Sequence, residues 1–219
     1  IRDSVASRGL GDVYKRQTEE TLLNLLDQLN NDQSVHGILV QLPLPDHIDE
    51  DVIIQSISFA KDVDGLHPMN VGNLSSGYQG SIPCTPLGCY YLLKKIEPNL
   101  TGKKAVMIGR SNLNGKAMAQ LLLQEDCTVT ITHSKTKDLQ HECLEADVIV
   151  AAVGIPELIK GNWVKKDAIV IDVGINKTEN GLVGDVDFEE VSKVARALTP
   201  VPAVSYTHLR AHETLRYRV

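Results

Sequence analysis

The chain has 219 residues, 42% of them hydrophobic and 23% charged, and a formal net charge of −6. This composition is that of an ordinary globular protein with enough chain for one or two domains and a buried core. The negative charge disfavours partners such as nucleic acid or an acidic membrane surface, and no apolar run approaches the roughly 18 residues of a membrane-spanning helix.

Cysteine usage and the N-terminus bear on metal binding and compartment. The four cysteines form no Cys-x-x-Cys pair. We therefore expect no metal site and no disulfide framework, with four reduced thiols in or near the core. The first residues lack the apolar stretch of a signal peptide, so the cytoplasm is the expected compartment.

The two ends differ from the middle of the chain. Residues 1–17 and 204–219 hold 7 of the 22 Lys and Arg but only 3 of the 28 Asp and Glu, and they show no apolar periodicity. We interpret them as adaptor-like sequence fused to a truncated gene, and a pair of genuine basic tails is the alternative. The fold is therefore predicted from residues 18–203, which carry 15 basic and 25 acidic residues.

The first predicted elements are a helix and a strand. Thr18 is expected to cap a helix in which leucines at positions 22, 25, 26 and 29 form one apolar stripe. Residues 35–40 are predicted to form a buried strand that ends at Gln41-Leu42-Pro43-Leu44-Pro45, because neither proline can donate to a ladder. Gln41 then stands where a parallel strand ends, the usual ligand edge of an α/β sheet. A glutamine that hydrogen-bonds to loop backbone is the alternative.

Two helices and an acidic turn follow. Residues 51–57 are predicted to form a short helix, and Thr85-Pro86 is a compact start for a second helix that runs to about Lys95. Between them, Asp62 and Asp64 stand one residue apart before a glycine. This pair could bind a hard cation, although the other oxygen ligands of a calcium loop are missing, and a solvated turn is the alternative.

The stretch from Lys104 to Gln124 organises the second half. Residues 105–108 predict a buried strand, Gly109-Arg110-Ser111-Asn112-Leu113-Asn114-Gly115 a tight loop, and the apolar residues after it a helix. A strand, a glycine loop and a helix start together form an anion site. The spacing is not G-x-G-x-x-G, so a nucleotide loop and a plain strand-to-helix turn both stay open.

Three more strands are expected, at residues 127–131, 147–153 and 168–173, then a turn with a short strand at 181–187 and a last helix at 188–197. The alternation predicts an α/β fold with a doubly wound parallel sheet. An NAD-binding unit has an acidic residue near the end of its second strand, where this chain has Ser134 and Lys135. With Arg110, these residues suit the 2′-phosphate of NADP, which a carboxylate would repel.

Together these pieces resemble the bifunctional methylenetetrahydrofolate dehydrogenase/methenyltetrahydrofolate cyclohydrolase family. The matching stretches cover residues 18–203 in order and are VHGILVQLPLP, KDVDGLHPMNVGNL, PCTPLGC, GRSNLNGKAMAQLLL, THSKTKDL, ADVIVAAVGIPELIKGNWVKKDAIVIDVGIN, GLVGDVDF and TPVP. The resemblance implies a truncated α/β folate-binding catalytic domain over residues 18–100 and a Rossmann-like NADP-binding domain over residues 101–203. It also implies a homodimer that acts on a small-molecule folate in the cytoplasm.

The resemblance implies roles for individual residues. Gln41 and Asp64 would be catalytic, Asp64 by binding the pterin ring and Gln41 by adjusting a catalytic lysine. The residues expected to line the folate site are Leu42, Pro43 and Pro202. The residues expected to hold NADP are Gly109, Arg110, Ser111, Ser134 and Ile175, with Arg110 and Ser134 at the 2′-phosphate and Ile175 at the nicotinamide end.

The family oxidises 5,10-methylenetetrahydrofolate with NADP and hydrolyses the methenyl product to 10-formyltetrahydrofolate. Its proton shuttle is the lysine of a Tyr-x-x-x-Lys motif, whereas here Tyr14 is followed at that spacing by Thr18. Ala203-Val204-Ser205 also replaces the family's glycine-rich segment after Pro-Val-Pro, and Asn114 and Lys116 stand where the family usually has valine and proline. We therefore expect a chain that binds NADP and catalyses poorly. A non-catalytic NADP-binding remnant or interaction protein, and a dehydrogenase of another small metabolite, are the alternatives.

Overall fold

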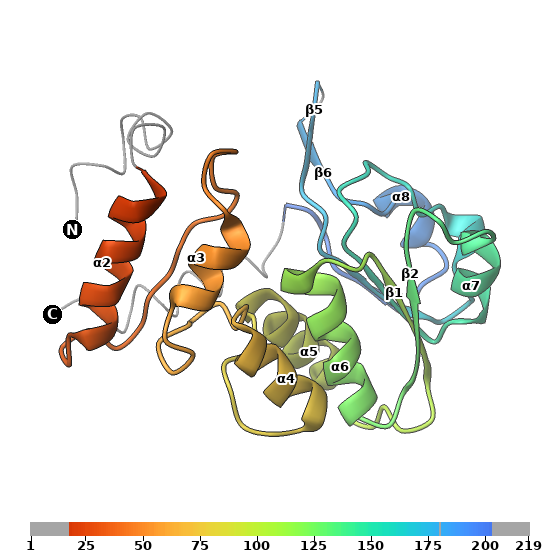
Figure 1. Cartoon of the computed structure of the whole chain (residues 1–219). Helices are drawn as coiled ribbons and strands as arrows, with labels where there is room; N and C mark the ends of the chain where they lie inside the picture. Colours follow the sequence, from red (N-terminus) through yellow and green to blue (C-terminus); the bar gives the residue numbers. More distant parts are fainter. Residues whose placement is uncertain (1–17, 180, 203–219) are drawn as a thin grey trace, which may run out of the picture. The chain divides into compact units, whose positions relative to one another are not determined.

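The structure is a computed structural model that describes residues 18–179 and 181–202. By internal contacts the chain divides into two compact units, residues 1–81 (unit 1) and 82–219 (unit 2), shown in Figure 1. The adaptor-like ends, Tyr14 and the segment Ala203-Val204-Ser205 lie outside the described residues.

Unit 1 contains three helices in its described part: α2 (Glu19–Asn31), α3 (Glu50–Ser56) and α4 (Pro68–Ser76). As predicted, Thr18 caps α2, and its Oγ1 accepts a hydrogen bond from Thr21 N at 3.2 Å. The apolar stripe of α2 buries Leu22 and Leu26 in a core shared with α3 and the loops beside it. The helix α4, which the sequence analysis did not predict, begins with Pro68 in its first turn and a cap from His67.

The predicted strand over residues 35–40 is wrong. The segment makes one isolated bridge, in which Ile38 N donates to Lys61 O at 2.7 Å, and Ile38 is the only one of the six residues that is fully buried. A strand needs hydrogen-bonding partners along its length. Among the described residues of unit 1, the stretch around Asp62 supplies a partner at a single point, so the apolar run stays an extended loop.

Unit 2 is a sheet with helices on both faces. Its helices and helical turns are α5 (Cys84–Ile96), the π-helical turn η1 (Asn112–Lys116), α6 (Ala117–Gln124), α7 (Leu139–Glu145), the 3₁₀ turn η2 (Gly161–Trp163) and α8 (Phe188–Val191). Its strands are β1 (Lys104–Ile108), β2 (Thr128–Thr132), β3 (Val148–Ala151), β4 (Ile169–Asp172), β5 (Asn176–Thr178), β6 (Gly181–Val183) and β7 (Ala197–Leu198). The main sheet has the order β2-β1-β3-β4-β7 with every pair parallel, and β5 and β6 form an antiparallel hairpin.

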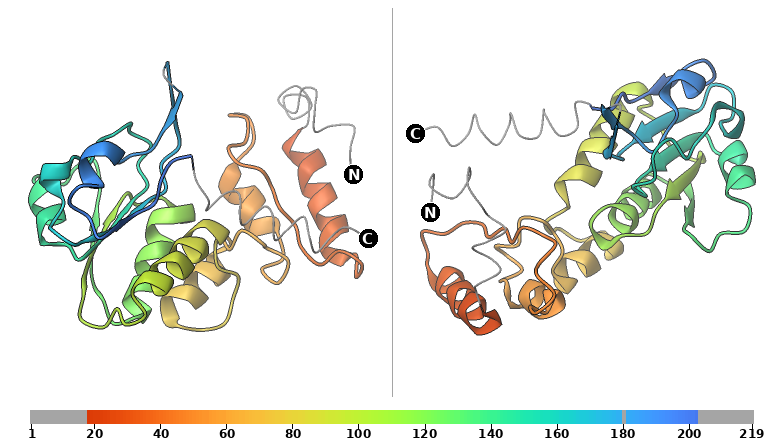
Figure 2. Two further views of the ribbon diagram at one scale, coloured as in Figure 1. Left: turned by 180° about the vertical axis from the view of Figure 1, so that it is seen from behind. Right: turned by 90° about the horizontal axis from the view of Figure 1, so that it is seen from above.

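Each central strand is buried on both faces, and its side chains alternate between two cores. Met107 of β1 packs with α5 and α6, whereas its neighbour Ile108 packs with the layer that contains α7 and α8. Figure 1 shows these helix layers on opposite sides of the sheet, and the views in Figure 2 agree. The chain reaches β2 from β1 through α6 and β3 from β2 through α7. The predicted doubly wound parallel sheet is therefore confirmed.

Some predicted boundaries move. The helix expected to begin at Pro86 with Thr85 as its cap begins two residues earlier, at Cys84 with Pro83 at the cap position, and it runs to Ile96. The last helix, expected over residues 188–197, stops at Val191, because the chain then turns to add β7 beside β4. The β5–β6 hairpin was predicted only in its second half.

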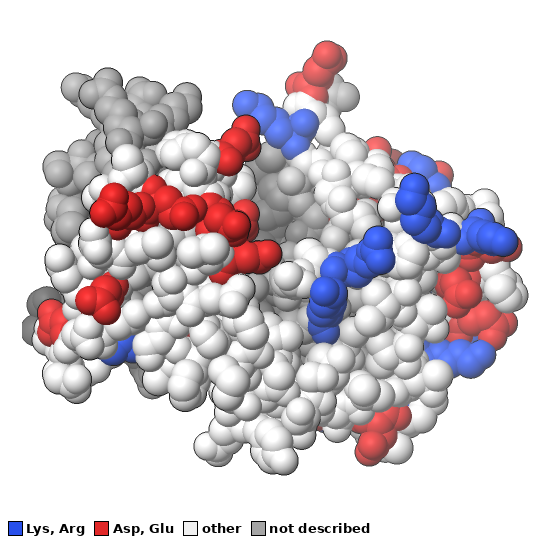
Figure 3. All heavy atoms as spheres, viewed as in Figure 1, with Lys and Arg blue, Asp and Glu red and all other residues white. Residues whose placement is uncertain are grey.

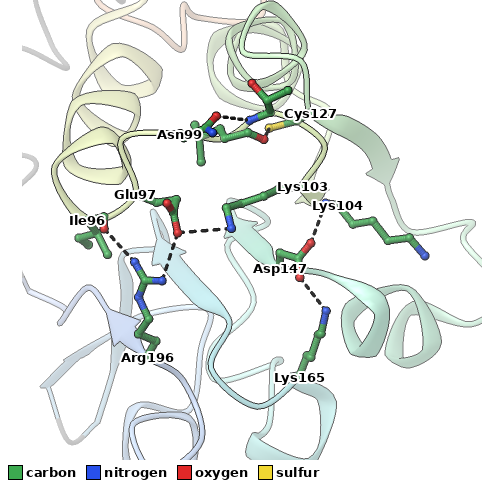
Figure 4. A network of polar contacts seen from close by, with 11 residues as sticks. Ile96, Glu97, Asn99, Lys103, Lys104, Cys127, Asp147, Lys165 and Arg196 are labelled. Atoms are coloured by element: carbon green, nitrogen blue, oxygen red, sulfur yellow. Dashed lines mark hydrogen bonds and ion pairs between the residues drawn. The ribbon is translucent and has the colours of Figure 1, made fainter.

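The α5 helix packs with unit 2, where it contacts α6, η1 and β4. Polar contacts tie its C-terminal end to the sheet (Figure 4). Glu97 accepts from Lys103 Nζ at 3.3 Å and from Arg196 Nη1 at 3.1 Å, and Arg196 Nη2 also donates to Ile96 O. By contacts α5 thus belongs with the second unit, while the functional domains at residues 18–100 and 101–203 stay a prediction.

Three of the cysteines are buried and Cys84 is exposed, and all four are thiols rather than parts of disulfides. Burial raises the pKa of the Cys89 and Cys143 thiols to about 12, so both stay protonated and act as small apolar side chains. Within residues 18–179 and 181–202, every helix is too short or too polar to cross a lipid bilayer.

Candidate functional site

The carboxyl edge of the parallel sheet gathers the loops that follow β1, β2, β3 and β4. In a doubly wound sheet, ligands bind at this edge, where successive crossovers pass to opposite faces. Here that switch lies between β1 and β3, which are neighbours in the sheet. The residues predicted to hold NADP follow β1, β2 and β4 and so reach this edge.

The glycine loop after β1 has a backbone that only glycine tolerates. Gly109 has a φ of 114°, and a Cβ there would overlap the carbonyl oxygen of Ala152 in the loop after β3. A Cβ on Gly115 would overlap Gly109 O and lie 2.7 Å from Arg110 Cα. The two glycines of the G-x-S-x-x-x-G pattern therefore let the loop fold back tightly on the helix that follows it.

Ser111 caps this helix start. Its Oγ accepts hydrogen bonds from Asn114 N at 3.2 Å and from Gly115 N at 3.3 Å. The hydroxyl hydrogen stays available as a donor. The N–H groups of Asn112 and Leu113 precede any carbonyl that a helix could offer them, so they can also donate to an anion.

The structure brings Arg110 and Ser134 to neighbouring positions on the sheet edge. Ile108 and Thr132 are register partners at the ends of β1 and β2, and Arg110 and Ser134 each follow two residues later. Both side chains are exposed. The turn that carries Ser134 is fixed by its own bonds, because His133 N donates to Thr136 Oγ1 and His133 Nδ1 accepts from Lys135 N. A guanidinium and a hydroxyl thus follow the paired ends of two neighbouring strands, and both groups suit an anionic ligand.

Ile175 follows β4 at the same edge and is 57% exposed although it is a large aliphatic residue. It lines a pocket of about 180 Å³ in unit 2, together with Cys89, Asp172, Thr199 and Pro200 among others. Burial raises the pKa of the Asp172 carboxyl to about 6, and the nearby charge of Asp185 adds to this, while N–H groups that donate to the carboxyl oppose it.

Sequence reasoning missed a pair of buried aspartates behind this edge. Asp172 is 7% exposed and accepts from the backbone N–H groups of Gly174, Asp185 and Val186. Asp185 is fully buried and accepts from Val153 N, Gly154 N and Asn176 Nδ2. The signal in the sequence was one carboxylate at the end of an apolar strand and another between Gly184 and Val186, but most of their partners lie nine or more residues away along the chain.

In unit 1 the residues predicted for the folate site lie on two adjacent loops. Leu42 and Asp64 line the same small pocket with Ile38, Val40 and other apolar side chains. Gln41 is exposed, and its Nε2 donates to Leu42 O at 3.0 Å, so it makes the backbone contact that was its alternative role. The Leu42–Pro43 peptide bond is cis, and Pro43 is exposed.

The two carboxylates of the acidic turn have different environments. Asp62 is 3% exposed and accepts from Gly65 N at 3.0 Å, His67 N at 2.8 Å and Asn70 Nδ2 at 2.9 Å. It therefore holds the turn together from inside, which sequence reasoning missed. Asp64 is half-buried on the pocket side. The turn is structured by Asp62 and presents Asp64.

Pro202 is exposed at the end of the described part of unit 2, after a cis Val201–Pro202 bond. The predicted folate-site residues are thus divided between the units, with Gln41, Leu42, Pro43 and Asp64 in unit 1. On the face drawn in Figure 3, acidic side chains form a band over unit 1, and Lys and Arg side chains gather over unit 2. The first turns of α2 and α3 contribute Glu19, Glu20, Glu50 and Asp51 to the acidic residues of unit 1.

The fold and the carboxyl edge of unit 2 define a nucleotide-binding α/β domain of the doubly wound class. Comparison with known proteins narrows the class. The NAD(P)-binding domain of tetrahydrofolate dehydrogenase/cyclohydrolase matches residues 83–205, and the catalytic domain of the same enzymes matches residues 10–64. The matches extend a few residues into both ends that the sequence analysis set aside. The chain therefore belongs to the tetrahydrofolate dehydrogenase/cyclohydrolase family.

Individual relatives agree with this assignment. A bifunctional protein FolD of Pelagibacter ubique is 78% identical over 184 residues, which are 84% of this chain and 66% of that protein. A bifunctional FolD crystal structure from Campylobacter jejuni has 53% identity and a TM-score of 0.85, covering 87% of this chain and 68% of that one. A Trypanosoma brucei FolD structure, complexed with NADP cofactor and inhibitor, has 38% identity and a TM-score of 0.81, with the same coverage. The chain thus spans slightly less than two thirds of the curated relatives it matches.

Proposed function

We propose that this chain carries the NADP and folate sites of an enzyme of one-carbon metabolism. The reaction is the oxidation of 5,10-methylenetetrahydrofolate with NADP, followed by hydrolysis of the methenyl product to 10-formyltetrahydrofolate. The observation that carries the proposal is that Arg110 and Ser134 follow the paired ends of β1 and β2, beside a glycine loop in a domain of this family. The proposed homodimer and cytoplasmic location follow from the family resemblance alone.

The residues of the carboxyl edge fit NADP better than NAD. The stretch Thr132-His133-Ser134-Lys135 at the end of β2 and just after it has no carboxylate, so no negative charge there would repel a 2′-phosphate and no carboxylate is present to accept from a free ribose hydroxyl. Arg110 supplies two or more N–H donors and Ser134 an O–H donor. Ser111 and the helix start face the remaining phosphates. NADP, when bound, supplies the carbon that accepts the hydride.

In unit 1, Asp64 and Gln41 are the proposed catalytic residues. The carboxylate of Asp64 would accept N–H groups of the pterin ring, and apolar neighbours such as Leu42 would exclude water from its plane. Gln41 would orient a lysine that moves the proton during hydrolysis. Pro43 and Pro202 would form further walls of the folate site.

We expect hydrolysis by this chain to be slow. Tyr14 is followed at the family's spacing by Thr18, and loss of a proton-transfer group typically costs about 100- to 10,000-fold in rate. A non-catalytic NADP-binding chain is therefore the second candidate function. Binding and turnover separate the two.

The test is to titrate the purified 219-residue chain with NADP and with a folate analogue, and then to assay both reactions. Binding of both ligands, with folate binding reduced in Asp64→Ala and unchanged in the exposed control Asp27→Ala, supports the folate enzyme. Binding of NADP alone supports the non-catalytic candidate. Cyclohydrolase turnover near that of a complete family member would contradict the expected impairment, and failure to bind either ligand would contradict the proposed function.

A further inference from the structure

Asp185 is a fully buried carboxylate that joins two loops at the carboxyl edge of the sheet. Its Oδ2 accepts from Val153 N at 2.6 Å and from Gly154 N at 3.0 Å in the loop after β3. Its Oδ1 accepts from Asn176 Nδ2 at 2.9 Å in the segment after β4. One side chain thus fixes the separation of the two segments.

Asp172 holds Asp185 in place from the end of β4. Asp172 Oδ1 accepts from Asp185 N at 3.0 Å and from Gly174 N at 2.9 Å, and Asp172 Oδ2 accepts from Val186 N at 3.0 Å. The chain leaves room for both carboxylates, because a Cβ on Gly174 would overlap Asp185 Oδ1 and a Cβ on Gly184 would overlap Asp172 Oδ2. The backbone and the two side chains therefore form one interlocked unit.

Ile175 lies between the two anchored residues. Its predecessor Gly174 donates its N–H to Asp172, and its successor Asn176 donates its side-chain amide to Asp185. The residues before and after Ile175 are therefore held, whereas the side chain of Ile175 is 57% exposed at the sheet edge. A fixed backbone with an exposed apolar side chain suits a flat ring that carries an amide group.

We propose that Asp185, held by Asp172, is a positioning residue that fixes the loops after β3 and β4 to receive the nicotinamide end of the dinucleotide. This inference rests on the proposed function, since it assumes a dinucleotide at the carboxyl edge. Asp185 has no exposed surface and so acts through the backbone it holds. Its effect is confined to one end of the ligand, because Arg110 and Ser134 follow other strands and make none of these contacts.

The test compares NADP with 2′,5′-ADP, which has the phosphorylated adenosine but lacks the nicotinamide. In Asn176→Asp, two carboxylates replace an amide–carboxylate pair, and repulsion should release the segment after β4. We expect this variant of the full chain to bind NADP about tenfold more weakly than the wild type and to bind 2′,5′-ADP unchanged. The double variant Asn176→Asp/Asp185→Asn restores the pair with donor and acceptor exchanged, and its NADP affinity should return to within about twofold of the wild type.

Thermal unfolding of each variant checks that the variant is folded. If Asn176→Asp fails to fold, Asn176→Ala takes its place, because it removes the hydrogen bond without adding a charge. Its expected effect is about threefold on NADP and none on 2′,5′-ADP. An equal loss for both ligands, no loss for NADP, or no rescue by the double variant would overturn the positioning role. A wild-type chain that does not bind 2′,5′-ADP would instead overturn the proposed function, and the positioning role with it.

Discussion

Asp62 in unit 1 and Asp172 in unit 2 are both buried, and each accepts three N–H groups from its surroundings. The sequence analysis considered Asp62 only as half of a possible cation pair and did not single out Asp172. Each holds the backbone beside a residue that was singled out, Asp64 in the first case and Ile175 in the second. Buried carboxylates with this many partners give a loop one conformation, which is what a preorganised binding site requires.

The raised pKa of Asp172 gives the first prediction. Burial moves it from 3.8 to about 6 in the folded chain. The protonated form therefore favours folding, and its contribution is fully present below a pH of about 4 and is lost as the pH rises through about 6. A carbon-13 NMR titration of the carboxyl groups should show Asp172 changing near pH 6. Glu145 is the control, because the hydrogen bond from Lys104 Nζ lowers its pKa, and it should titrate well below pH 6. Titration of Asp172 at or below the ordinary pKa of an aspartate would contradict the account.

Asn114 gives the second prediction. Its Oδ1 is buried and finds no hydrogen-bond partner among the described residues, and it lines a tight apolar site with Pro86, Cys89 and Met107. An unpaired buried polar atom costs about 1 to 3 kcal/mol. Asn114→Val should therefore raise the free energy of unfolding by about 1 kcal/mol in urea titrations. An equal or lower stability would mean that the amide has a partner in solution.

At the scale of elements, Lys61 joins two segments of unit 1. Its Nζ donates to Leu29 O, Asn30 O and Asp32 O at 2.6 to 2.8 Å, so a positive charge closes the C-terminal end of α2. Lys61→Met should cost about 1 to 2 kcal/mol and should speed amide hydrogen exchange in the last turn of α2. The exposed Lys166→Met is the control, and equal exchange rates in both variants would contradict this role.

The glycine loop gives a prediction with a control in the same chain. Gly115→Ala would force a Cβ against the backbone of Gly109 and Arg110 and should cost about 2 kcal/mol or more while weakening NADP binding. Gly72 lies inside α4 with nothing within 4 Å of its Cβ position, so Gly72→Ala should be neutral or stabilise by up to about 1 kcal/mol. Thermal unfolding measures the stability change of each variant, and a titration with NADP measures binding by Gly115→Ala. A stable Gly115→Ala variant with normal NADP binding would show that the loop and helix do not pack this closely.

Helices and strands could be predicted from the sequence where the local hydrophobic pattern matches the burial of the segment in the folded chain. The strands β1, β3 and β4 are short apolar runs between turn residues, and nearly all of their residues are buried, as such runs indicate. The strand β2 alternates threonine with apolar residues and is only partly buried. Residues 35–40 have the same pattern as β1, β3 and β4 but find a partner only at Ile38, and a strand cannot be inferred without its neighbour. The hairpin strands β5 and β6 are three residues each and partly polar, so no periodicity marks them.

The candidate site also has features that could be predicted from the sequence and features that could not. The position of Arg110 and Ser134 after the ends of neighbouring parallel strands could be predicted, because the carboxyl ends of such strands lie at one edge of the sheet. The roles of Asp62, Asp172 and Asp185 could not, since sequence pattern alone does not show which backbone N–H groups and side-chain amides donate to a carboxylate in the folded chain. Local sequence shows which residues are polar, but not which of them are already satisfied.

For the molecule as a whole, each unit holds residues proposed for a different ligand. Unit 1 presents Asp64, Gln41 and an apolar loop, and unit 2 presents a glycine loop with positive charge beside it. The proposed function requires both, whereas the non-catalytic alternative requires unit 2 alone. Both functions share one element, a dinucleotide site at the carboxyl edge of unit 2 that recognises a 2′-phosphate. This site is the central claim.

Titration calorimetry of the 219-residue chain with NADP and with NAD tests this claim most directly. Charge-assisted hydrogen bonds from Arg110 and Ser134 predict NADP affinity about 10- to 100-fold above that for NAD. The Arg110→Ala variant should lose most of this difference by weakening NADP binding while it leaves NAD binding unchanged. Equal affinity for the two dinucleotides in the wild-type chain, or binding of neither, would contradict the account.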